Sequence, residues 1–226
     1  MPSLVRKRAM LCLFHFDSLI HTKLHFAWSS ISEIIRTERF FFEDSNNPTN
    51  GTDYFAEQNK QIGSIIAIAF MVIGGFMVFN GLIRDFSSFG FSRAFVMLML
   101  ILTYILLAVS EPGKTDVLQY AWVLQTSGGI AINTNQMYLC YLFPDMIGFQ
   151  MGLNYAMKGF GSMLPQFWLM LVQDGMVSYK SIMWLWATLT ILSFIIGLVI
   201  LPWQVFENND DDMPNVFQVW VEKTEV

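Results

Sequence analysis

Long apolar stretches without a formal charge dominate the pattern of hydrophobic and polar positions along this chain. A membrane-spanning helix needs about 20 mostly apolar residues. A backbone inside lipid must also satisfy its own hydrogen bonds, so each such stretch predicts a helix. Four stretches are uncharged: 62–83, 94–110, 117–144 and 181–206. A fifth, 146–173, is interrupted only by Lys158. The pattern therefore predicts an all-α protein that crosses a bilayer several times.

The first apolar segment, residues 10–35, is less suited to a membrane than the others. It carries the formal charges of Asp17, Lys23 and Glu33. Each charge at the centre of a bilayer costs about 2.5–3.5 kcal/mol on insertion scales. We therefore expect this segment to insert inefficiently, and we treat residues 1–26 as an atypical N-terminal segment.

Basic residues predict on which side of the membrane each loop lies. The link after residues 62–83 carries Arg84 and Arg93, and basic residues near helix ends favour the cytoplasm. The polar stretch 43–60 then lies outside, where Asn50, followed by Gly and Thr, is a glycosylation acceptor. The N-terminus lies outside if the first segment fails to span, and inside if it spans.

The rest of the chain forms one membrane domain and one tail. No Gly/Ser-rich linker divides residues 27–203, so we predict a single helical domain there. Residues 204–226 contain three consecutive aspartates and more acidic than basic residues, which is typical of an acidic cytosolic tail.

Composition indicates the class of partner and excludes several kinds of chemistry. Hydrophobic residues make up 54% of the chain and charged residues 14%, so a lipid bilayer is the expected partner. The net charge of −5 argues against nucleic-acid binding. Cys12 and Cys140 have no metal-binding or redox spacing, and His21 and His25 form a pair without a third ligand. The predicted helices between residues 62 and 144 hold no His, Asp or Glu. We therefore expect no metal, no cofactor and no enzymatic activity.

Several polar or small residues lie at membrane depth in the predicted helices. An ionisable residue such as Lys158 inside a spanning helix is a functional candidate by default, and the alternative is that its side chain reaches toward the membrane surface. The run 125–136 is rich in amides, hydroxyls and glycines, which serve either helix packing or a substrate path. The candidates for a substrate path are Gln125, Ser127, Gly129, Asn133, Asn135 and Lys158.

The link between the second and third predicted helices resembles a known signature. It contains Gly81, Arg84, Asp85, Gly90 and Arg93, and looks like the cytoplasmic motif of the major facilitator superfamily. More specifically, the chain resembles the N-terminal half of solute carrier family 43 from Ala27 to Trp203. The matching pieces are residues 27–30, 34–41, 142–145, 173–178 and 201–203. Phe86 departs from the motif, since a basic residue is usual there, and the first helix upstream of Ala27 is not recognisable.

This resemblance implies a six-helix N-terminal half of a facilitative transporter in the plasma membrane, with an atypical first helix. The implied activity is sodium-independent uniport of large neutral amino acids. Nucleobase transport, as in one branch of the family, stays open, as does a non-transporting regulatory role. Because such transporters bind solute between two halves, we expect the chain to pair with a second half or with another copy. Without a partner, the polar candidates named above would face lipid, and the chain alone would not transport.

Overall fold

The computed structural model describes residues 4–21, 27–41, 51–87, 89–111, 115–140 and 146–201. Within these ranges the protein is helical and has no β-strand, which confirms the predicted all-α class. In chain order the helices are α1 (Leu4–His21), α2 (Trp28–Thr37), α3 (Gly51–Phe86), α4 (Phe89–Val109), α5 (Thr115–Cys140), α6 (Ile147–Gln173) and α7 (Tyr179–Ile200).

Each of the five long apolar stretches coincides with a helix, from α3 to α7. Among the described residues, three helical segments are long and apolar enough to cross a membrane: Gln58–Arg84, Gly90–Val109 and Tyr179–Ile200. The protein therefore has helices compatible with membrane association.

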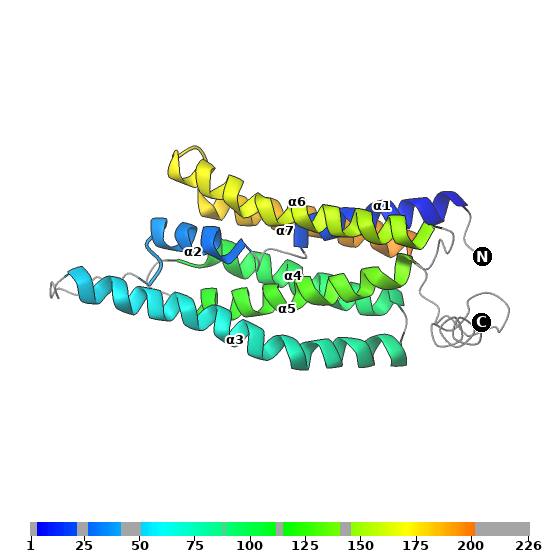
Figure 1. Cartoon of the computed structure of the whole chain (residues 1–226), viewed down its shortest axis with the longest axis horizontal. Helices are drawn as coiled ribbons and strands as arrows, with labels where there is room; N and C mark the ends of the chain where they lie inside the picture. Colours follow the sequence, from blue (N-terminus) through cyan, green and yellow to red (C-terminus); the bar gives the residue numbers. More distant parts are fainter. Residues whose placement is uncertain are drawn as a thin grey trace.

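The long helices lie side by side along one axis, and α1 and α2 lie toward opposite ends of that axis (Figure 1). Helix α1 begins at the end of the bundle where α7 finishes. Packing agrees with this view, because Met10 and Phe14 of α1 are buried against Leu201, just after α7. The polar first segment is thus a packed part of the bundle, in two pieces.

The apolar core joins α2 to the beginning of α7. Ile31, Ile34 and Ile35 of α2 are buried, at the i, i+3, i+4 spacing that puts residues on one helix face. After α2 the chain turns through Arg39 and Phe41, which both have positive φ. The same turn holds the buried Phe40 with its ring centroid 5.4 Å from that of Tyr179. The backbone N–H of Tyr179 donates to Glu38 Oε1 at 3.1 Å.

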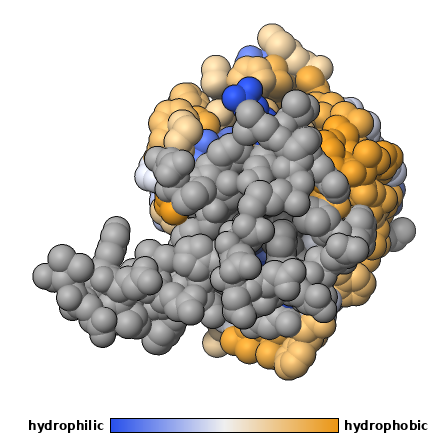
Figure 2. All heavy atoms as spheres, turned by 90° about the vertical axis from the view of Figure 1, so that its right-hand side faces the viewer, coloured by the Kyte–Doolittle hydropathy of each residue, from blue (hydrophilic) through white to orange (hydrophobic). Residues whose placement is uncertain are grey.

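Apolar side chains also cover much of the outside of the bundle. In the end-on view of Figure 2, hydrophobic residues lie along its flanks. A water-exposed surface of this extent is unusual for a soluble monomer, whereas lipid would cover it favourably. The exposed residues include Phe70, Met71, Phe79, Leu98, Leu102, Phe160, Met163, Phe167, Ile195 and Val199.

Candidate functional site

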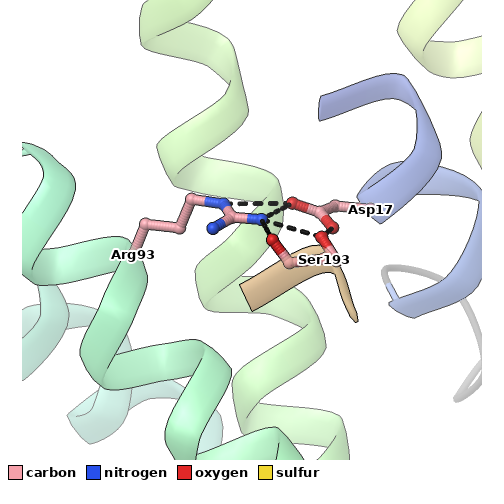
Figure 3. Close-up of polar contacts among 3 residues, drawn as sticks. All are labelled: Asp17, Arg93 and Ser193. Carbon is pink, nitrogen blue, oxygen red and sulfur yellow. Dashed lines mark hydrogen bonds and ion pairs between the residues drawn. The ribbon is translucent and has the colours of Figure 1, made fainter. Parts of the chain in front are cut away.

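A buried ion pair joins α1, α4 and α7. Arg93 donates to Asp17 Oδ2 from Nε at 3.1 Å and from Nη2 at 2.7 Å. Nη2 also donates to Ser193 Oγ at 2.9 Å, and the Ser193 hydroxyl donates to the other carboxylate oxygen of Asp17. The two charged side chains are 2% and 0% exposed. Figure 3 shows how the three residues converge from their three helices.

The surroundings of the guanidinium are shaped to hold it. Gly197 lies one helical turn after Ser193, and a Cβ at that position would lie 1.9 Å from Arg93 Nη1. The Phe14 ring lies on another side, with its centroid 5.6 Å from Arg93 Cζ, at the distance of a cation–π contact. Gly197 of α7 thus leaves space for the guanidinium, and the Phe14 ring of α1 packs against it.

Further polar contacts connect α1 to α6 and α4. His15 Nε2 lies 3.1 Å from Gln150 Oε1, and the Ser18 hydroxyl donates to Asn154. On the other side, His21 Nδ1 lies 3.1 Å from the Tyr104 hydroxyl. The polar residues of α1 therefore meet polar residues on neighbouring helices.

Lys158 lies inside the bundle, between α5 and α6. It is 1% exposed and donates to Asn133 Oδ1. Its Nζ also lies 4.8 Å from the centroid of the Tyr155 ring. With Gln150 and Asn154 it forms a stripe at a spacing of four residues, which lies on one face of α6. Of these three residues, only Lys158 was predicted from the sequence. Gln150 and Asn154 were not predicted, although their spacing of four residues from each other and from Lys158 is visible in the sequence.

A second polar group holds α3, α4 and α5 together. Asn80 Nδ2 donates to Asn135 Oδ1 at 3.3 Å, and Asn135 Nδ2 donates to Ser92 Oγ at 3.2 Å. The Ser92 hydroxyl in turn lies 3.1 Å from Asn80 Oδ1. All three residues are buried. This network is a packing contact of the kind that joins helices in membranes.

The remaining path candidates of α5 have different surroundings. Ser127 donates to the Val123 carbonyl of its own helix at 3.0 Å, and Gly129 is buried. Gln125 is fully buried beside the Tyr104 hydroxyl but makes no hydrogen bond of good geometry to any described residue.

The six path candidates therefore lie in different surroundings. The exposure to lipid expected for the five polar ones, all but Gly129, is wrong. Asn133 is half-buried and accepts from Lys158, while the other five are buried inside this single chain. The reason is that α1, α3, α4 and α6 all pack against α5, and Asn80 of α3 covers Asn135 directly. Because these groups are buried within a single chain, they do not require a second half to shield them from lipid.

All five residues of the link motif lie within helices. Gly81, Arg84 and Asp85 belong to the last turns of α3, and Gly90 to the first turn of α4. Arg93 follows one turn later and is buried against Asp17, so it displays no charge at the link. The cytoplasmic assignment of this link therefore depends on Arg84.

Three sequence predictions fall outside the described residues: the glycosylation acceptor Asn50, the second histidine of the pair, His25, and the tail 204–226. Comparisons of the chain with protein-family models, curated proteins and solved structures found no match. The resemblance to solute carrier family 43 therefore stays a prediction from the residues of the sequence alone.

Proposed function

We propose that this chain is the six-helix half of a major-facilitator transporter of the solute carrier family 43 type. In this proposal it resides in the plasma membrane and carries large neutral amino acids by sodium-independent uniport. The observation that carries the proposal is the contrast between apolar flanks and a charged and amide-rich interior. Ionisable groups at membrane depth mark solute or ion pathways more often than simple anchors.

The solute path in this proposal lies next to the α5–α6 contact. Lys158 and Asn133 offer a cation and an amide there, which suit the carboxylate and the amino group of a zwitterionic solute. Transporters of this architecture enclose solute between two repeats that rock against each other. Two copies of the six-helix unit, or this unit with a second half, would supply both repeats.

Uptake into vesicles at several protein densities tests this function. The purified chain is reconstituted in sodium-free buffer, and entry of labelled leucine is compared with entry of labelled adenine. We expect leucine uptake to rise more steeply than linearly with protein density, because two units must meet to form one path. Crosslinking of the same vesicles should show the paired species at the active densities.

Three results would contradict parts of the proposal. Leucine uptake that is strictly linear down to the lowest density would mean that a single unit transports by itself. Entry of adenine but not leucine would assign the chain to nucleobase transport. Absence of uptake where crosslinking shows pairs would favour the non-transporting regulatory role.

Orientation is tested separately through the predicted outside loop. We expect wild type expressed in cells to lose apparent mass on treatment with an N-glycan endoglycosidase, and Asn50→Gln to abolish that shift. Asn47 is a matched control in the same loop, because Pro48 between it and Thr49 prevents glycosylation. Asn47→Gln should keep the shift; an unshifted wild type with an externally labelled Arg84 link would reverse the orientation.

A further inference from the structure

Helix α1 is packed among membrane helices although its own sequence is poorly suited to lipid. It is not among the segments long and apolar enough to cross a membrane. Nevertheless Met10, Phe14 and Asp17 are all buried in the bundle. A carboxylate is stable there only with a partner that neutralises it and satisfies its oxygens.

The cross-helix polar contacts described above for α1 all reach residues much later in the chain. Asp17 pairs with a residue 76 positions later, and the partners of His15, Ser18 and His21 follow at least 83 positions later. Ser193, which completes the cover of Asp17, lies 176 positions later. These contacts of α1 therefore form only once α4, α6 and α7 are in place.

We propose that Arg93 is the residue that brings α1 into the membrane bundle and thereby fixes the side on which the N-terminus lies. Asp17 and Arg93 enter the apolar region as one neutral pair. The pair is held in a socket made by Ser193 and Gly197 of α7 and by the Phe14 ring. The N-terminus follows α1 to the side where α7 ends.

The surroundings of the pair indicate that the contact between Asp17 and Arg93 is specific rather than incidental. Arg93 makes two hydrogen bonds to one carboxylate oxygen, and a hydroxyl satisfies the other oxygen. The missing side chain at Gly197 leaves the space that Nη1 fills. Removing either charge would leave the other buried and unpaired, whereas removing both would leave two neutral, hydrogen-bonding groups.

The experiment places one epitope tag at the N-terminus of the full chain and another at the C-terminus. Antibody access to each tag is measured in intact and in permeabilised cells. In wild type we expect both tags on the same side. In Asp17→Asn and in Arg93→Gln, the ratio of same-side to opposite-side molecules should fall by about tenfold or more. The double variant Asp17→Asn/Arg93→Gln should recover the wild-type ratio.

The first segment also offers a matched control. Glu33 and Arg36 of α2 form an ion pair at 2.8 Å whose side chains are 44% and 36% exposed. Neutralising either one should leave the tag ratio unchanged, because exposed pairs contribute little.

The double variant shows whether the single variants fail because one buried charge is left unpaired or because the substitutions themselves disturb folding. Single variants that keep the wild-type ratio, or a loss in only one of them, would overturn the proposal. A double variant as defective as the single ones would overturn it too, since no unpaired charge remains in it. These outcomes do not depend on transport, so they also stand apart from the proposed function.

Discussion

Gly161→Ala is expected to force α1 away from α6 and to lower the stability of the bundle by about 2–3 kcal/mol. A Cβ at position 161 would lie 2.3 Å from the backbone carbonyl oxygen of Leu19 and 3.1 Å from its carbonyl carbon. Backbone atoms inside a helix do not move aside as the end of a flexible side chain does. The two helices must therefore separate, which weakens the contact between Ser18 and Asn154.

Thermal unfolding in detergent, followed by tryptophan fluorescence, measures this effect. We expect the midpoint of Gly161→Ala to fall by about 5–10 °C, given about 2–4 °C per kcal/mol for a chain of this size. Gly159→Ala is the matched control on the same helix, because a Cβ there would meet no atom within 4 Å. The control should be neutral or slightly stabilising, since alanine favours a helix over glycine. Equal midpoints for the two variants would refute the close approach.

The existence of the five long helices was predictable from sequence because lipid-compatible helices require uninterrupted apolar length. Their starting points were less predictable. The third-helix stretch was taken to start at residue 94 because Arg93 carries a formal charge, yet α4 begins at Phe89. A charge ends an apolar stretch in a hydropathy reading. Because the carboxylate of Asp17 neutralises its charge, Arg93 lies buried within α4.

The pairing of Arg93 with Asp17 could not be predicted from the sequence. Helix periodicity relates residues three or four positions apart, whereas these two residues are 76 positions apart. The first segment therefore looked unsuited to a membrane, and its packing against the other helices was not predicted, whereas the structure buries residues of α1 inside the bundle. Thr126 and Ser127 show the same limit within α5. Both donate to carbonyls of their own helix, while Asn133 and Asn135 bond across helices. Composition alone did not separate these two uses of a polar side chain.

Asn135→Leu is expected to unlink α3 from α4 and α5 while keeping the number and branching of the side-chain heavy atoms. The substitution removes the acceptor for Asn80 Nδ2 and the donor to Ser92 Oγ, both buried. Buried polar groups left without a partner cost about 1–3 kcal/mol each, although contacts between membrane helices average less. We therefore expect a loss of about 2 kcal/mol.

The same unfolding assay distinguishes this network between helices from side-chain hydrogen bonds made within α5. Thr134→Val also replaces a polar group by an apolar one of similar shape, next to Asn135. The Thr134 hydroxyl donates to the Ala131 carbonyl of its own helix at 2.8 Å, and it accepts a long hydrogen bond of 3.5 Å from Asn80 Nδ2. We expect Asn135→Leu to lower the midpoint by about 4–8 °C and Thr134→Val to change it little. If both variants unfold at the same temperature, the network between Asn80, Ser92 and Asn135 does not hold α3, because its central amide would then contribute no more than an intrahelical hydroxyl.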